Sequence, residues 1–178
     1  MPKSNWKTTQ IFQQLEKSNS QYAQSIITLL KHPNVMDAIE NILDKGGNTP
    51  KDFTLHDADH SFRVAERMWE LIPNATKEVL SQYELGFLLL SAYLHDIGMS
   101  PDFNKVELHK SFLTSDVKEG LTEDEINEFQ KWIDNDSKTE SIDIRKEKIQ
   151  DPKAFNYILS YYIRSKHNDW SGEWIKKI

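Results

Sequence analysis

Three polar residues, placed at the ends of two largely apolar segments, could hold a metal ion. His60 stands near the start of the segment 58–72, and His95 and Asp96 stand together at the end of the strongly apolar segment 85–94. Imidazole and carboxylate groups are common ligands of divalent metals. Such groups are seldom carried into an apolar environment unless they are paired or coordinate an ion. The pattern therefore predicts a metal site of mixed nitrogen and oxygen ligands.

Each of these residues also has a simpler interpretation. His60 could hydrogen-bond a backbone carbonyl at the start of a helix. His95 would interact favourably with the dipole at the end of a helix, and Asp96 could cap the next turn. A carboxylate at the C-terminal end of an apolar helix opposes that dipole, however, and a cation nearby would compensate for it. A second His-Asp pair, His56-Asp57, lies in a polar stretch. It is interpreted as a loop in which Asp57 or Asp59 caps the following helix.

The elements that would position these residues are helices. Apolar residues recur with helical spacing, and the alternation typical of strands is almost absent. The sequence therefore predicts an all-α fold, with the apolar helix that ends near Asp96 at its centre. The segments expected to be helical are about 6–30, 35–43, 58–72, 81–96, 103–113, 122–132 and a long helix from 152 onward.

Several helix ends can be predicted from local signals. Ser81 with Glu84, and Thr122 with Glu125, have the spacing of capping boxes. Gly98 is expected to provide the left-handed residue that ends the helix before it. The polar segment 134–150 is interpreted as a loop or a marginal surface helix.

Composition limits the class of protein and its partners. The 178 residues include no cysteine, so disulfides, thiolate metal sites and cysteine nucleophiles are excluded. The net charge of −6 and the lack of a basic stripe argue against bulk binding of nucleic acid. The longest apolar run is too short to span a bilayer, and the N-terminus lacks the apolar region of a signal peptide. A cytoplasmic protein without membrane contact is expected.

The motifs resemble those of the HD-domain superfamily of metal-dependent phosphohydrolases. The resemblance covers residues 50–178 and looks closest to the HD branch associated with GHKL-type ATPase domains. It implies an HD-domain-like helical bundle at 50–178, with residues 1–49 as an N-terminal helical extension that packs on it. The matching stretches are His60-Ser61-x-x-Val64, Tyr93-Leu94-His95-Asp96-Ile97-Gly98 and the similar downstream stretch Ile163-Arg164-x-x-His167-x-x-x-Ser171.

The resemblance also implies roles for individual residues. His60, His95 and Asp96 would hold a divalent metal (Mn, Fe, Ni, Zn or Mg), and Asp96 and His95 would be catalytic. His167 and Asp169 would support that metal or hold a second one. For His167, a hydrogen-bonded histidine between Trp170 and Ile163 is an equally good interpretation. Arg164 and Lys166 would contact phosphate, as would Arg63 unless it forms ion pairs with nearby glutamates.

One feature of the family is missing. Its final metal-binding Asp normally lies in a late apolar helix, and neither Asp151 nor Asp169 has that context. The chain therefore looks truncated before this residue, and three ligands without a fourth predict weak metal binding and weak turnover.

Two functions are compatible with these features. The first is hydrolysis of a small phosphorylated substrate, a phosphate ester or phosphodiester that resembles a nucleotide. The second is a sensor or docking module with little or no activity that regulates a partner such as an ATPase. Either function is compatible with a homo-oligomer.

Overall fold

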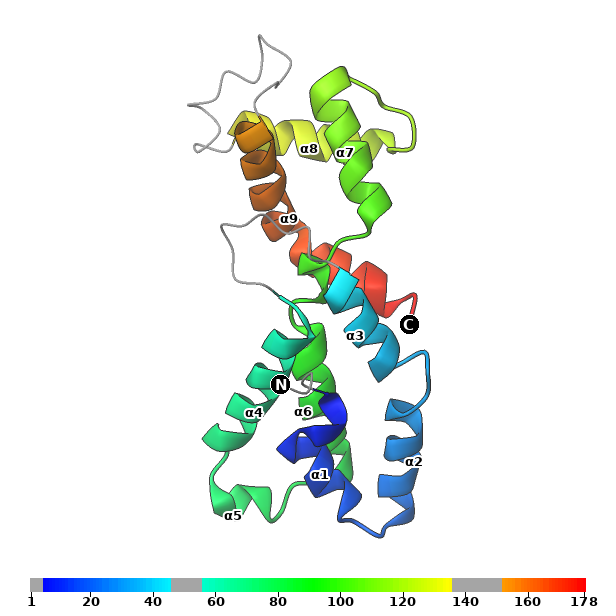
Figure 1. Ribbon diagram of the computed structural model, residues 1–178, viewed down its shortest axis with the longest axis vertical. Coiled ribbons are helices and arrows are strands. Elements are labelled where there is room, and N and C mark those ends of the chain that lie inside the picture. Colours follow the sequence, from blue (N-terminus) through cyan, green and yellow to red (C-terminus); the bar gives the residue numbers. More distant parts are fainter. Residues whose placement is uncertain (1–4, 46–55, 136–151) are drawn as a thin grey trace.

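The computed structural model describes residues 5–45, 56–135 and 152–178, and every regular element in these ranges is a helix (Figure 1). The all-α prediction is therefore confirmed. The elements are 3₁₀ helices η1 (Trp6–Thr8) and η2 (Ile97–Met99) and α-helices α1 (Gln10–Glu16), α2 (Gln21–Leu30), α3 (Met36–Lys45), α4 (Ala58–Leu71), α5 (Asn74–Lys77), α6 (Gln82–Leu94), α7 (Phe103–Ser115), α8 (Glu123–Asn135) and α9 (Pro152–Ile175).

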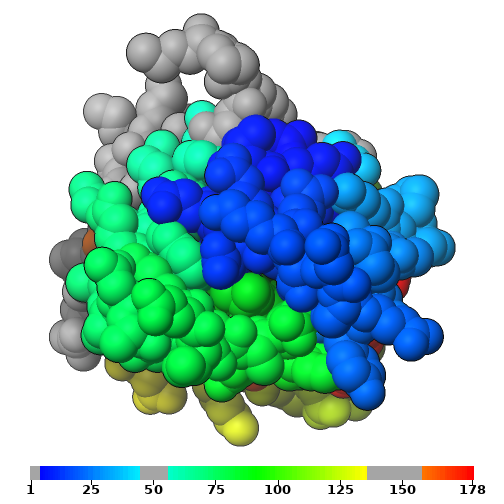
Figure 2. Space-filling model, turned by 90° about the horizontal axis from the view of Figure 1, so that it is seen from below, coloured from blue at the N-terminus to red at the C-terminus, as the bar shows by residue number. Residues whose placement is uncertain are grey.

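The described residues form two apolar cores, and the first lies in the lower part of the molecule around α6 (Figure 1). Helices α1, α2, α3 and α4 all contact α6, as its nearly continuous apolar sequence predicts. Phe12, Leu89 and Tyr93 are among its fully buried side chains. Figure 2 shows α1 and α2, in blue, beside the green helices at this end. The N-terminal helices thus share one core with α4 and α6, while the predicted division at residues 49 and 50 lies outside the described residues.

The second core lies in the upper part, between α7, α8 and α9. Phe129 from α8 packs against Tyr162 from α9 with ring centroids 4.4 Å apart, and Ile158 is fully buried beside them. Helix α9 extends from this core down to the first core (Figure 1). There the side chain of Trp174 packs against the buried residues of the first core. One long helix therefore connects the two cores.

The starts of α6 and α8 were predicted correctly from local capping signals. Ser81 and Glu84 form a capping box at the start of α6. Thr122 and Glu125 bond in the same reciprocal way at the start of α8. Segment 136–151, which includes most of the predicted polar loop, lies outside the described residues. Among those that are described, no helix combines the length and the apolar content needed to cross a membrane.

The prediction of a left-handed conformation at Gly98 is wrong. Among the described residues, the positive backbone φ angles belong to Asp116 (54°) and Gly120 (89°). Helix α6 instead ends at His95 with right-handed geometry, and the chain continues into η2. A Cβ atom at Gly98 would lie 1.9 Å from the backbone oxygen of His167. Glycine is required here because α9 approaches the backbone closely, not because of its φ angle.

His109 is a buried titratable group in the second core. Its side chain contacts the rings of Phe129 and Tyr162, and its Nδ1 bonds the carbonyl of Lys105 at 2.8 Å. Its Nε2 is buried and has no hydrogen-bond partner among the described residues. Burial lowers the pKa of this imidazole, because a charge there would lack solvation.

We therefore expect acid to destabilise the fold through His109. The unfolded chain, with an ordinary pKa near 6.5, binds a proton more readily than the folded chain does. Stability is thus fully present above about pH 6.5 and falls below it by up to about 1.4 kcal/mol per pH unit. Between pH 7.0 and pH 5.5, the free energy of unfolding measured with urea should fall less in His109→Phe than in the wild type. Equal losses in the two proteins would contradict this assignment.

Candidate metal centre

Two helix ends bring the candidate ligands together. Asp57 caps α4 by accepting a hydrogen bond from the backbone N–H of His60 at 2.8 Å, which fixes His60 in the first turn. His56 immediately precedes this cap. His95 ends α6, and Asp96 follows it before η2. Because α4 and α6 pack against each other, the start of one meets the end of the other.

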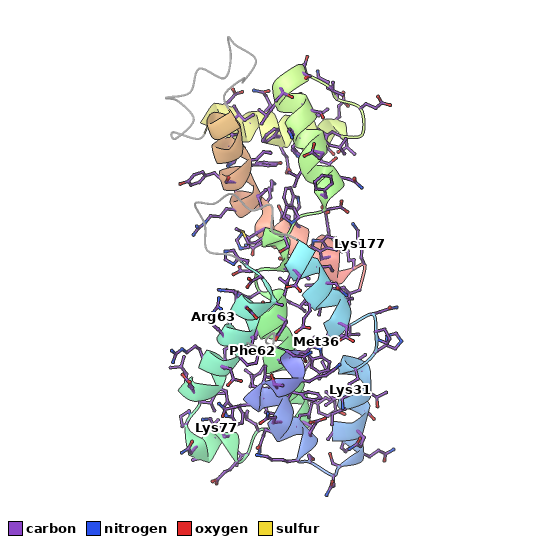
Figure 3. All side chains as sticks on the ribbon, in the orientation of Figure 1. Lys31, Met36, Phe62, Arg63, Lys77 and Lys177 are labelled. Carbon is purple, nitrogen blue, oxygen red and sulfur yellow. The ribbon has the colours of Figure 1, made fainter. Side chains whose placement is uncertain are left out.

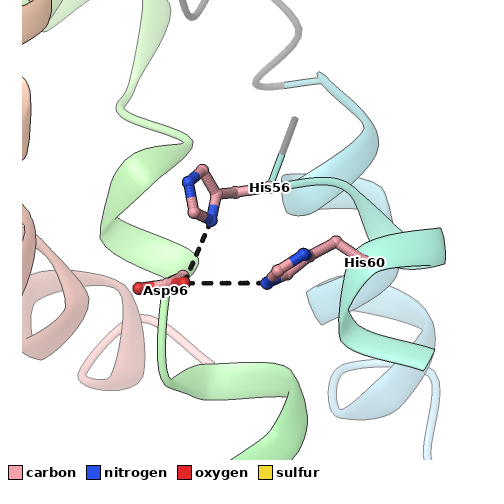
Figure 4. A group of neighbouring side chains, drawn as sticks. All are labelled: His56, His60 and Asp96. Atoms are coloured by element: carbon pink, nitrogen blue, oxygen red, sulfur yellow. Dashed lines mark ion pairs between the residues drawn. The ribbon is translucent and has the colours of Figure 1, made fainter. Parts of the chain in front are cut away.

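Three imidazole rings surround one carboxylate oxygen, Oδ2 of Asp96. The distances to this atom are 2.8 Å from Nε2 of His95, 3.0 Å from Nδ1 of His56 and 3.8 Å from Nε2 of His60. Figure 4 shows His56 and His60 pointing toward Asp96. The ring of His60 lies between the other two, with centroids 5.0 Å from His56 and 5.5 Å from His95. Three imidazole nitrogens thus face one carboxylate oxygen, and the ligand atoms of His56, His60 and Asp96 form the group whose members all lie near one another.

The cluster is only partly open to solvent. The exposed fractions of the side chains of His56, His60 and Asp96 lie between 18% and 22%, and that of His95 is 36%. A small molecule or ion can therefore reach the cluster, while its electrostatic interactions are stronger than at a fully exposed surface.

The pKa values within the cluster follow from this packing. The hydrogen bond from His95, together with its charge and those of His56 and His167, lowers the pKa of Asp96 to about 2. The same hydrogen bond raises the pKa of His95. Burial and the neighbouring histidines lower the pKa of His60, which favours its neutral form. An ionised carboxylate and a neutral imidazole are the forms that bind metal.

Apart from the pKa values, an unpaired buried nitrogen and the spacing of the ligand atoms also fit a divalent metal. Nδ1 of His56 is buried and lacks a hydrogen bond of good geometry, even though Asp96 is near it. One ligand atom each from His56, His60 and Asp96 lie within 4.8 Å of one another. Ligands about 2.1 Å from a common ion are spaced by roughly 3.0–3.5 Å, close to the distances found here. An ion at this point would satisfy the unpaired nitrogen and the carboxylate together.

The three ligands predicted from the motifs, His60, His95 and Asp96, do lie together. His56 was missed, because its position in a polar stretch before a helix was interpreted as a loop. No helical spacing marks it in the sequence, because His56 precedes the N-cap Asp57 and so lies outside α4. His56 supplies the nearby fourth group that the motifs alone did not offer.

The other predicted site residues lie on α9. His167 is close enough to Asp96 to affect its pKa, and its Nδ1 bonds the carbonyl of Arg164 at 2.6 Å. Asp169 is paired with Lys166 at 3.3 Å, and Lys166 also contacts Glu128 of α8 at 2.9 Å. The structure thus brings His167 toward the cluster and places Asp169 and Lys166 in an ion-pair network toward α8.

Arg164 and Arg63, the remaining candidates for phosphate contact, are both exposed. Arg63 projects from the outer side of α4 (Figure 3). It is near enough to His60 to help lower the pKa of that imidazole. Its interactions with phosphate, like those of Arg164, stay predictions.

Comparison with known families identifies the family of this chain. The sequence profile of the HD-CE family matches residues 51–178, which is well over half of the chain. The chain belongs to the HD-CE family. All four clustered residues of this HD-CE protein lie within the matched region. No curated protein and no solved structure matches the chain.

The pKa of His95 leads to a prediction about metal binding by the HD-CE protein. Its raised value means that a proton occupies the imidazole up to a higher pH than usual. If His95 is a ligand, this proton must leave on binding. Below the pKa of His95, we expect the affinity for Mn²⁺ to fall about tenfold per pH unit. Titrations at pH 6, 7 and 8 measure this slope, and a constant affinity would show that His95 is not a ligand.

Proposed function

We propose that this chain is an HD-type metal-dependent phosphohydrolase that acts on a phosphate ester or phosphodiester, with a nucleotide-like molecule as substrate. The observation that carries the proposal is the convergence of His56, His60 and His95 on one oxygen of Asp96. Membership of the HD-CE family supports it. The partial exposure of the cluster leaves room for a substrate to approach.

His56, His60, His95 and Asp96 would hold the divalent metal. When bound, the metal supplies activation of water and neutralisation of phosphoryl charge. Asp96 contributes the negative charge, since its low pKa keeps it ionised at neutral pH. His60 contributes a neutral nitrogen, because burial disfavours its protonated form. The earlier expectation of weak binding assumed three ligands, so with His56 as the fourth we now expect stable binding.

The donor chemistry favours some metals over others. Imidazole nitrogen suits zinc, nickel and iron, and manganese accepts mixed nitrogen and oxygen ligands, whereas magnesium prefers oxygen ligands throughout. With three imidazoles and one carboxylate, we propose a transition metal rather than magnesium as the resident ion.

The residues proposed to bind substrate phosphate lie on α9. We retain Arg164 and Lys166 as proposed contacts, along with His167. Lys166 would have to leave Glu128 and Asp169, to which it is now paired. A substrate with two or more negative charges could compete for this lysine, which favours a nucleotide-like molecule over a phosphodiester with a single charge.

The test is an assay of nucleotides and a generic phosphodiester with Mn²⁺, Ni²⁺, Zn²⁺ and Mg²⁺. We expect turnover with a transition metal, loss of turnover in Asp96→Asn and near-normal turnover in Asp169→Asn. Turnover that persists in Asp96→Asn would contradict the proposal.

An alternative is a sensor or docking module that regulates an ATPase-domain partner. Exposed aromatic side chains favour it: Tyr22, Tyr83 and Phe87 are 62%, 54% and 67% exposed, and the rings of the two tyrosines are 5.9 Å apart. Clustered exposed apolar groups often mark interaction sites. The test is ATP hydrolysis by a GHKL-type partner with the wild type and with Phe87→Ser. Exposed Val79 provides a control as Val79→Ser. Regulation lost only in Phe87→Ser would support the module.

A further inference from the structure

A serine on α9 holds the turn that follows the candidate metal ligands. The backbone N–H of Gly98 donates a hydrogen bond to Oγ of Ser171 at 2.9 Å. The same hydroxyl donates to the carbonyl of His167 at 2.7 Å. Ser171 is 8% exposed and Gly98 is buried, so water cannot readily replace these bonds. The hydroxyl therefore joins η2 to α9 through two bonds.

The backbones of η2 and α9 are in close contact at this point. A Cβ atom at Gly98 would lie 1.9 Å from the oxygen of His167 and 2.7 Å from the backbone nitrogen of Ser171. One turn further along α9, Nε1 of Trp174 donates to the carbonyl of Ser100 at 3.0 Å. Two side chains of α9 thus fix two points of the turn, at Gly98 and Ser100.

This turn begins at a candidate metal ligand. Asp96 is the residue before η2, and its carbonyl accepts a hydrogen bond from Met99 at 2.8 Å. Its side chain makes no capping bond to the turn. The orientation of the carboxylate therefore depends on where the turn is held, and the turn is held by α9.

We propose that Ser171 is a positioning residue for the metal centre. It fixes η2 so that the carboxylate of Asp96 faces the three imidazoles. This inference rests on the proposed function, since it concerns the same metal. It also gives α9, which connects the two cores, a direct influence on the site.

The experiment compares Ser171→Ala with Ser165→Ala in the full chain. Ser165 is the control, because it is an exposed serine of α9 whose hydroxyl bonds the carbonyl of Tyr162 within the same helix. Mn²⁺ affinity is measured by calorimetry, and exchange of the Gly98 amide hydrogen is followed by NMR without metal. For Ser171→Ala we expect faster exchange and a 10- to 100-fold loss of affinity, the range seen when residues that orient ligands are removed. Ser165→Ala should change neither, and Ser171→Thr, which keeps the hydroxyl, should recover part of the affinity.

The outcomes separate the two proposals. Faster exchange with unchanged affinity would overturn the positioning role and leave the metal centre intact. A wild type that binds no Mn²⁺, Ni²⁺ or Zn²⁺ would overturn the proposed function, and the positioning role with it. Should Ser171→Ala fail to fold, Trp174→Phe keeps the aromatic packing and removes the bond to Ser100. Unchanged affinity in that variant would then count against control of the site by α9.

Discussion

Replacing Asp96 by Asn is expected to lower the affinity for divalent metal by at least about 100-fold. The substitution keeps the shape of the side chain and removes its negative charge, while all three imidazoles in the cluster converge on this one carboxylate. Loss of residues that only orient ligands already costs 10- to 100-fold, so loss of a charged ligand should cost no less. Calorimetric titration with Mn²⁺ or Zn²⁺ measures the change.

The control for this variant is Asp169→Asn. Asp169 is a carboxylate of the downstream stretch 163–171, where it is paired with Lys166 and largely exposed. We expect its metal affinity to stay within about twofold of the wild type. Circular dichroism of both variants checks that they are folded. An Asp96→Asn protein that is folded and binds metal as tightly as the wild type would remove the carboxylate from the site.

Replacing Gly98 by Ala is expected to destabilise the protein by about 3 kcal/mol or more. The new Cβ would meet backbone atoms of His167 and Ser171, which cannot move without shifting α9. Overpacking of this kind typically costs about 1–3 kcal/mol, and rigid backbone neighbours place this case at the upper end. Urea unfolding monitored by circular dichroism measures the free-energy change.

Gly172 provides a matched control on α9. A Cβ atom there would have no neighbour within 4 Å. Alanine lowers the conformational entropy of the unfolded chain and favours the helix, so Gly172→Ala should stabilise the protein by about 0.5–1 kcal/mol. The free energy of unfolding should therefore fall in Gly98→Ala and rise in Gly172→Ala. A Gly98→Ala protein as stable as the wild type would show that η2 and α9 are not in close contact.

The sequence allowed the helices and several of their ends to be predicted, because those depend on neighbouring residues. The capping boxes at Ser81 and Thr122 are local, since each joins residues three positions apart. The burial of α6 followed from its apolar composition alone. His60, His95 and Asp96 were recognised as a group because they stand at the ends of two apolar segments, and because their motifs resemble those of a known family.

The features that could not be predicted depend on the packing of distant segments. His56 becomes part of the cluster only when α4 and α6 meet, and its sequence context is that of an ordinary polar loop. The role of Gly98 depends on α9, more than 70 positions further along the chain. A helix-ending glycine and a glycine under a close backbone contact look the same in a sequence.

The most direct test of the metal centre is an anomalous diffraction map from crystals grown with Mn²⁺ or Zn²⁺. We predict one strong peak within about 2.0–2.3 Å of nitrogen atoms of His56, His60 and His95 and of a carboxylate oxygen of Asp96. A peak elsewhere on the protein, or none at this cluster at saturating metal concentration, would contradict the assignment of these residues as metal ligands.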